Sequence, residues 1–316
     1  MKKSPAIQNR STKGDPITQK TPMAFADEKS AVEFMESLRW DGRPGCPRCG
    51  DMDVYQMQGK TGRQANYRWR CRGCKEQFTV RTGTVFEDSR IPMRHWCYAF
   101  WRASTSKKGV SALEIHRQTG VSYKSALFML NRIRYAMSDS APPFLNGTVE
   151  VDETYVGGRP RKRQKKQGNP HTKTPVIAMV QRGGIVKTQV VADVTGKTVQ
   201  HILSQSLQSS AHLITDEHSS YILAGRLLAS HETVNHSLGE YVRGHVTTNT
   251  VEGFFSIVKR GLNGIYHSVS KKHLHRYMAE FEFRYNYAQL EDGDRMKKAI
   301  VSGQGKRLTY RDTVMA

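Results

Sequence analysis

The 316-residue sequence has no long hydrophobic run, and its cysteines and acidic residues are few for its length. No stretch approaches the roughly 18 consecutive apolar residues of a membrane-spanning helix, which excludes a polytopic membrane protein. The N-terminus runs from Lys2 and Lys3 into polar residues without an apolar segment, so the sequence carries no recognisable secretory signal. We therefore expect a protein of the cell interior that does not bind a membrane.

Only five cysteines are present, too few for a disulfide framework in a chain of this length. In a reducing compartment such thiols are metal ligands or core residues instead. The sequence contains 28 Asp and Glu residues and 49 Lys and Arg residues, which gives a net charge of +21. A basic excess of this size indicates a polyanionic partner, and nucleic acid is the expected one.

Hydrophobic spacing along the chain predicts a multidomain α+β protein. Residues 1–22 are polar and basic without an apolar period, which indicates a flexible tail. A short helix and small β-hairpins are expected over 23–90, followed by helices over 91–142. Strands and helices alternate over 143–295 in an order that favours a mixed sheet with helices packed against it. Residues 296–316 are expected to form a C-terminal tail.

Four of the cysteines form two C-x2-C pairs, Cys46 with Cys49 and Cys71 with Cys74. Two tight turns of this kind supply the four sulfur ligands that one Zn²⁺ binds in a tetrahedron, at about 2.3 Å. Redox cysteines and an iron–sulfur cluster are the alternatives. A segment this small and charged cannot bury enough apolar surface alone, so bound metal would supply folding free energy. Residues 23–90 are therefore predicted to be a zinc ribbon with a preceding helix.

Two features in the N-terminal half indicate DNA contact. Arg68 and Arg70 flank Trp69 in the ribbon, and basic residues with aromatic neighbours suit phosphates, although they would also solvate a small domain. Further along, two short helices are joined by a turn that contains Gly120, the pattern of a helix-turn-helix over 91–142. Groove contacts are then expected from the start of the second helix, at Ser122, Tyr123 and Lys124.

Three acidic residues stand out by their settings in this basic chain. Asp152 lies within a strand predicted over 148–156, whose alternation places it on one face with Glu150. Asp216 ends the apolar run 213–215, and Glu252 lies near the start of an amphipathic helix predicted over about 249–261. Converging carboxylates repel one another unless cations bind there, and oxygen ligands of this kind suit Mg²⁺. Two such ions support displacement at phosphorus. The alternative is that each acid is an ordinary helix cap or surface charge.

Other residues extend this candidate site. Asn249, one turn before Glu252, is the alternative third ligand, although a carboxylate binds Mg²⁺ better than a neutral amide does. Lys259 lies two helical turns after Glu252 on the same face, where its ammonium would hold a phosphate backbone. A basic segment follows the Asp152 strand and is predicted to bind phosphates beside the site, unless it is only a solvated loop. Its residues are Arg161, Lys162, Arg163, Lys165 and Lys166.

With these motifs the sequence resembles DDE transposases of bacterial insertion sequences, in the group that has an N-terminal zinc ribbon and a ribonuclease-H-like core. The resemblance covers about residues 25–290. It rests on both cysteine pairs and on the stretches 151–158, 215–218, 249–260 and 266–286.

The resemblance implies a Mg²⁺- or Mn²⁺-dependent enzyme that cleaves DNA at element ends and transfers the freed 3′-OH to target DNA. Asp152, Asp216 and Glu252 would hold two metal ions within a ribonuclease-H-like DDE domain over 143–295. Double-stranded DNA would be the partner, and the chain would be a homo-oligomer on it. A cytoplasmic, nucleoid-associated location in a bacterium is expected.

Two other functions fit parts of the same sequence. A zinc-ribbon and helix-turn-helix regulator would bind DNA without cutting it, but it has no use for three carboxylates together. A structure-specific endonuclease would use the same carboxylates and stop at hydrolysis. Joining of a labelled DNA end to a target plasmid separates the endonuclease from the transposase.

Overall fold

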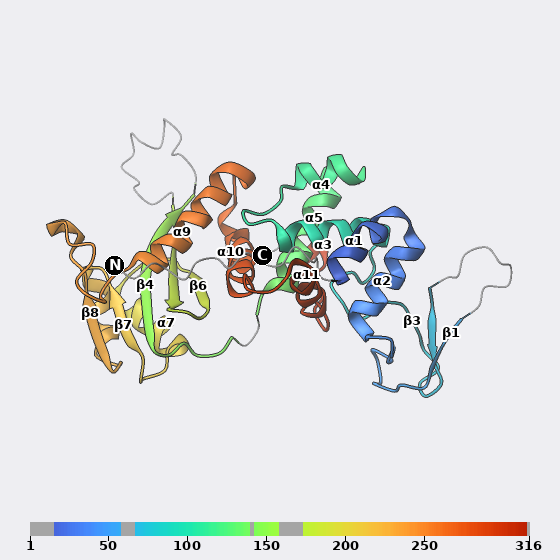
Figure 1. Ribbon diagram of the computed structural model, residues 1–316, viewed down its shortest axis with the longest axis horizontal. Coiled ribbons are helices and arrows are strands. Elements are labelled where there is room, and N and C mark those ends of the chain that lie inside the picture. The colour runs from blue at the N-terminus through green and yellow to red at the C-terminus, as the bar shows by residue number, and fades with distance from the viewer. Residues whose placement is uncertain (1–15, 58–66, 140–141, 158–172, 315–316) are drawn as a thin grey trace. The chain divides into compact units, whose positions relative to one another are not determined.

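The structure is a computed structural model that describes residues 16–57, 67–139, 142–157 and 173–314. The chain divides into two compact units, the first made of residues 1–105 with 290–307 and the second of 106–289 with 308–316. In the described part of the chain, no helix is long and apolar enough to cross a membrane. The predicted multidomain α+β class is confirmed (Figure 1).

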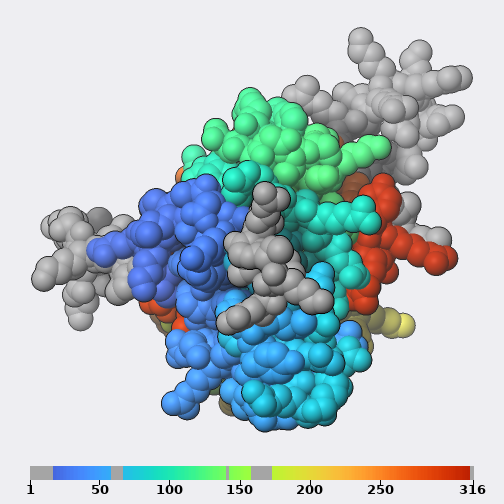
Figure 2. Space-filling model, turned by 90° about the vertical axis from the view of Figure 1, so that its right-hand side faces the viewer, coloured from blue at the N-terminus to red at the C-terminus, as the bar shows by residue number. Residues whose placement is uncertain are grey.

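The first unit combines helices with a small antiparallel sheet in the order β1-β2-β3. Its helix α2 (Glu28–Trp40) is capped at its N-terminus by Asp27, whose carboxylate accepts a hydrogen bond from the backbone N–H of Ser30 at 2.9 Å. Asp41, in a left-handed conformation, caps its C-terminus. Figure 2 shows a face of the molecule on which the N-terminal part of this unit, coloured blue to cyan, lies at the surface. The elements are α1 (Pro16–Ala26), α2 (Glu28–Trp40), β1 (Val54–Gln56), β2 (Trp69–Cys71), β3 (Gln77–Phe78), α3 (Met93–Thr105) and α11 (Asp292–Val301).

The second unit contains a five-stranded mixed sheet in the order β6-β5-β4-β7-β8. Strands β4, β5 and β6 are antiparallel, whereas β7 and β8 run parallel to β4. The strands are β4 (Thr148–Val156), β5 (Thr174–Gln181), β6 (Val186–Val190), β7 (His212–Thr215) and β8 (Ser230–Thr233). The helices are α4 (Ala112–Thr119), α5 (Tyr123–Met137), α7 (Gly196–Ser206), α8 (Ile222–Gly225), α9 (Asn249–Gly261), α10 (Leu274–Asn286) and α12 (Tyr310–Val314).

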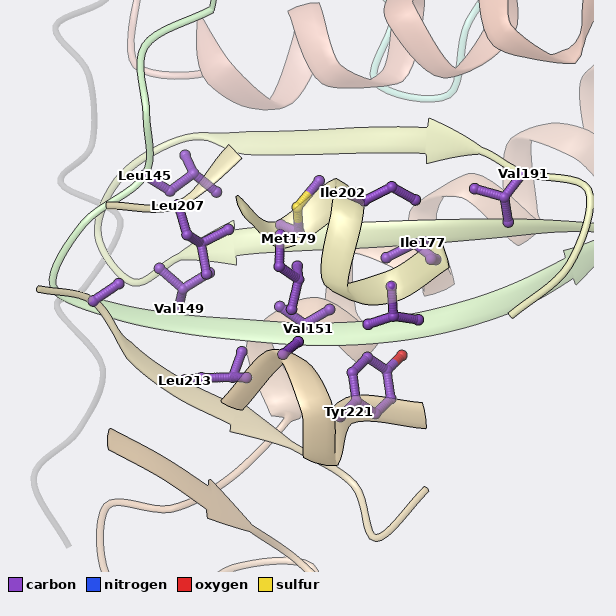
Figure 3. Packing of buried hydrophobic residues seen from close by; sticks show 14 residues of the cluster. Leu145, Val149, Val151, Ile177, Met179, Val191, Ile202, Leu207, Leu213 and Tyr221 are labelled. Atoms are coloured by element: carbon purple, nitrogen blue, oxygen red, sulfur yellow. The ribbon is translucent and has the colours of Figure 1, made fainter. Parts of the chain in front are cut away.

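Helices cover both faces of this sheet. Val149 and Val151 of β4 belong to an apolar cluster shared with α7 (Figure 3). Alternate residues of β5, such as Val176 and Ala178, pack on the other face against α9 and α10. Because strand side chains alternate, Glu150 and Asp152 point to the α9 face. The sheet thereby directs a polar row of β4 toward the start of α9.

Side chains of α10 cover the exposed edge of the sheet. Asn286 accepts a hydrogen bond from the backbone N–H of Val186 at 2.8 Å and donates one to its carbonyl at 3.1 Å. Glu282 accepts from both the backbone N–H and the hydroxyl of Thr188. These bonds occupy the edge of β6, which would otherwise be free to pair with another strand.

A buried ionic network ties α5 to α10 within the second unit. Arg134 of α5 donates to Glu280 of α10 at 2.7 Å, and the Tyr266 hydroxyl donates to the same carboxylate at 2.7 Å. The Arg134 guanidinium lies 3.8 Å from the ring centre of Tyr277. Burial opposes ionisation of Glu280, but the guanidinium groups of Arg284 and Arg134 lower its pKa. Helices α5 and α10 are therefore joined by a buried charge pair, and removing either partner would leave an uncompensated buried charge.

The structure corrects three expected boundaries. Helix α1 begins at Pro16, within the expected tail 1–22, and Thr21 is buried. Helix α11 lies in the expected tail 296–316, where Met296, Ala299 and Ile300 are buried. Helix α3, expected to join the helix-turn-helix over 91–142, belongs to the first unit. Helix α1 packs against the neighbouring α2 and against α3, whereas α11 packs against α3, α1 and α2, which are far away in the sequence.

Candidate active site

A single cavity gathers the three acidic residues singled out from the sequence. Asp152 comes from the middle of β4, Asp216 directly follows β7, and Glu252 lies in the first turn of α9. The cavity has a volume of about 780 Å³. It is lined by Asp152, Asp216, His236, Thr248, Glu252, Phe255, Ser256, Lys259, Arg260, Asn263 and Gly264. Adjacent parallel strands and one crossing helix thus bring together acids that are 100 positions apart in the chain.

The negative charges of Asp216 and Glu252 affect the pKa of Asp152. Burial, together with the negative charges of Glu153, Asp216 and Glu252, raises the pKa of Asp152 to about 7. The backbone N–H of Glu153 donates to the Asp152 carboxylate at 2.7 Å and opposes this effect. The cavity therefore concentrates negative potential at Asp152, and a bound cation would relieve it.

The donor set of this cavity fits a hard divalent cation. Carboxylate oxygens with room for water and phosphate are the ligands that Mg²⁺ and Mn²⁺ prefer. Among the described residues, only the four cysteines form a group of candidate ligand atoms that all lie within 4.8 Å of one another. The three carboxylates are therefore less tightly gathered than the cysteine sulfurs.

Glu150 holds the start of α9 and thereby positions Glu252. Its buried carboxylate accepts hydrogen bonds from the backbone N–H groups of Thr250 at 2.7 Å and Val251 at 3.0 Å. It also accepts from the Thr250 hydroxyl at 2.8 Å and pairs with Arg182 at 2.6 Å. A carboxylate at a helix N-terminus satisfies free N–H groups and complements the helix dipole.

We expect the substitution Glu150→Gln to lower the free energy of unfolding by about 3 kcal/mol, because the Arg182 charge loses its buried partner. In addition, the NH2 group of the glutamine would face the N–H and O–H donors that now bind the carboxylate. Urea unfolding followed by circular dichroism measures the change. Glu232→Gln is the control, since Glu232 pairs with His245 at the surface and should change stability by less than about 0.5 kcal/mol. Equal effects of the two substitutions would contradict a special role for Glu150.

The four cysteines of the first unit form a separate metal centre. The Cys46 and Cys74 sulfurs lie 3.6 Å apart, as do those of Cys49 and Cys71. Although burial opposes it, hydrogen bonds from the backbone N–H groups of Cys49 and Arg48 lower the pKa of Cys46 to about 7. Four sulfurs at this spacing fit the tetrahedral coordination of a structural Zn²⁺.

Comparison with known proteins gives the family of the chain. The profile of the ISXO2-like transposase domain matches residues 144–286, and that of the transposase zinc-ribbon domain matches residues 26–77. The chain belongs to the ISXO2-like transposases.

Relatives of this transposase include an uncharacterised protein in transposable element ISH50 of Halobacterium salinarum. The two are 30% identical over 278 residues, which cover 82% of this chain and 91% of the relative. An uncharacterised transposase-like protein of Haemophilus influenzae is 27% identical over 118 residues, or 37% of this chain and 94% of the relative. A match to a chain of a solved pre-cleavage Mos1 transpososome covers 63% of this chain and 75% of that chain, at 14% identity. Its TM-score of 0.22 is too low to show a shared fold.

The candidate third ligands of the transposase occupy different positions on α9. Glu252 lines the cavity, and its carboxylate accepts a hydrogen bond from the Thr248 hydroxyl at 2.8 Å. Lys259 lines the same cavity further along the helix. Asn249 is exposed and is not among the lining residues. The geometry therefore favours Glu252 over Asn249.

His236 is a lining residue that sequence reasoning missed. Its Nε2 lies 3.6 Å from the Glu252 carboxylate and 3.3 Å from the Thr248 hydroxyl. Glu217 fixes its backbone, accepting from the N–H groups of His236 at 2.9 Å and Ser237 at 3.0 Å. The Ser237 hydroxyl and these N–H groups lower the pKa of Glu217 to about 2. The only sequence signal was the position of Glu217 directly after Asp216.

The predicted DNA-binding residues of this transposase lie on three segments. Ser122 caps α5 by accepting from the backbone N–H of Ser125 at 3.2 Å, and Tyr123 and Lys124 follow it at the surface. Arg68 is exposed, and Arg70 is half-buried and donates to the carbonyl of Lys75 at 3.1 Å. The basic residues Arg161, Lys162, Arg163, Lys165 and Lys166 lie outside the described part of the chain.

Proposed function

We propose that this transposase cleaves DNA at the ends of its insertion sequence and joins the freed 3′-OH ends to target DNA. Two Mg²⁺ or Mn²⁺ ions would be held by Asp152, Asp216 and Glu252. The observation that carries the proposal is the cavity in which these acids meet Lys259 and Arg260. When bound, the ions would activate the attacking oxygen and stabilise the leaving oxygen at phosphorus.

The residues of the chain divide the remaining tasks. Glu150 and Thr248 orient Glu252 before any ligand arrives, which is the preorganisation that a metal site needs. Lys259 and Arg260 carry positive charge on the same cavity wall and would hold the phosphates on either side of the cleaved bond. Phe255 forms an apolar part of that wall, which limits access of bulk water.

The remaining segments would bind and align the DNA ends. In this proposal Ser122, Tyr123 and Lys124 contact a groove, while Arg68, Arg70 and the basic segment 159–166 contact phosphates. One Zn²⁺ bound to the four cysteines would keep the ribbon folded. Cutting two ends in one event requires at least two active sites, so we propose a homo-oligomer on DNA, at the bacterial nucleoid.

The proposal predicts that cleavage of a labelled element end and its joining to a target plasmid both require Mg²⁺ or Mn²⁺. The labelled duplex is incubated with the protein, the plasmid and either metal, and the products are separated on a denaturing gel. Chelation with EDTA should abolish both products. Binding without cleavage in either metal would identify a regulator, and cleavage without joining would identify an endonuclease.

A further inference from the structure

The segment that joins β8 to α9 presents apolar side chains to solvent. We call residues 235–247 the rim loop, because it leads from β8 to the cavity-lining Thr248. Leu238, Tyr241 and Val242 are 82%, 62% and 55% exposed. In Figure 1 the rim loop lies at the end of the sheet where α9 begins. Large exposed apolar side chains gathered in one short segment indicate a binding surface rather than ordinary solvent contact.

The backbone of the rim loop is fixed at both ends. Glu217 binds the first turn through the N–H groups of His236 and Ser237. Arg182 donates to the carbonyl of His245 at 2.7 Å and to that of Thr247 at 2.8 Å, while it pairs with the buried Glu150. Beneath the loop, Val234 and Val246 pack with Ile214. The backbone that carries the exposed side chains is therefore anchored at both ends, which lowers the entropy cost of ordering the loop around a ligand.

The apolar surface is continuous with the cavity. The ring centre of Tyr241 lies 5.2 Å from that of His236, which lines the cavity beside Glu252. Lys259 and Arg260 line the same cavity, and Arg243 of the rim loop is exposed. A ligand that spans both regions needs anionic groups for the cavity and flat apolar faces for the loop. The phosphates and bases of a DNA strand have this combination.

We propose that Tyr241, flanked by Leu238 and Val242, stacks on an unpaired base next to the phosphate that enters the cavity. This inference rests on the proposed function and names the base contact of the same site. Stacking on a tyrosine holds a base without reading its sequence, since every base has a π-face. The loop would thereby hold the strand end out of the duplex while its phosphate lies between Asp152 and Lys259.

Photocrosslinking tests the contact without requiring catalysis. The protein with Asp152→Asn is bound to element-end duplexes in which 5-iododeoxyuridine replaces each nucleotide beside the cleaved bond in turn. Irradiation should yield a crosslink to Tyr241, located by mass spectrometry of the digested complex. Adding Tyr241→Ala should remove the crosslink and weaken binding of ends with unpaired terminal nucleotides by roughly fivefold, whereas Tyr241→Phe should preserve that affinity.

Leu227→Ala is the matched control, because Leu227 is 49% exposed in the same unit and lies outside the rim loop and the cavity. It should leave affinity unchanged. Equal affinities of Tyr241→Ala and the control would overturn the inference while leaving metal-dependent cleavage intact. The inference would also be overturned if sedimentation showed that the protein self-associates without DNA and that Tyr241→Ala abolishes this self-association. Failure of the unsubstituted protein to cleave any end would instead reject the proposed function.

Discussion

Asp152→Asn should reduce DNA cleavage at least about a thousandfold while DNA ends still bind. Asparagine has nearly the shape of aspartate, but it removes one of the negative charges that would hold divalent cations in the cavity. The carboxylate of Asp152 accepts a hydrogen bond from the backbone N–H of Glu153 at 2.7 Å, and an amide oxygen can accept this bond equally well. Cleavage assays and filter binding on the same labelled end measure the two properties separately.

The same substitution should stabilise the metal-free protein. The folded pKa of Asp152, about 7, lies above its ordinary value of 3.8, so the folded state resists losing this proton and stability falls as the pH rises between these values. Above about pH 7 the full cost is present, on the order of 4 kcal/mol for a pKa raised from 3.8 to about 7. Removing the charge should recover about 1–2 kcal/mol of it, because the buried amide of asparagine carries a desolvation cost of its own. Below about pH 4 the gain should vanish. Thermal unfolding at several pH values measures it.

Asp193→Asn is the matched control for both measurements. Asp193 is exposed, and hydrogen bonds from Thr198 and Thr195 lower its pKa, so the same substitution removes a favourable charge. It should leave cleavage unchanged and should not stabilise the protein. Full cleavage by Asp152→Asn, or stabilisation of equal size by both variants, would remove Asp152 from the candidate site.

Local sequence periodicity predicted the elements that carry the three acids. Alternation along 148–156 placed Glu150 and Asp152 on one face, and the structure forms β4 over Thr148–Val156. The amphipathic spacing predicted a helix at about 249–261, which is the range of α9. Both patterns depend only on neighbours in the chain, so a single sequence suffices to read them.

Features that depend on distant partners could not be read in this way. Glu150 looked like any strand acid, because Thr250 and Val251, which bind it, are a hundred positions away. His236 lies in a loop without periodicity and reaches the cavity only because Glu217 holds its backbone. The apolar stripe of α11 is too narrow to identify a core helix from the sequence. The location of α3 in the first unit follows from its packing against α1, α2 and α11, of which α11 is distant in the sequence.

Cys71→Ser should abolish zinc binding and unfold the ribbon. Its strands have three, three and two residues, and its apolar cluster consists of Cys46, Cys71 and Phe78 with three partly buried side chains. So small a core cannot offset the entropy of ordering the chain. Structural zinc contributes about 10–16 kcal/mol in small domains, far more than this cluster can supply.

Zinc content should fall from one ion per chain to none, and limited proteolysis should cut within residues 43–82. The ends should also bind more weakly, because Arg68 and Arg70 lose their fixed positions. Cys97→Ser is the control: Cys97 is buried in α3, apart from the four-sulfur cluster, and burial raises the pKa of its thiol. This variant should keep its zinc and its resistance to protease within 43–82. A Cys71→Ser protein with full zinc content would show that three sulfurs suffice, and a protease-resistant ribbon without zinc would show that its core folds alone.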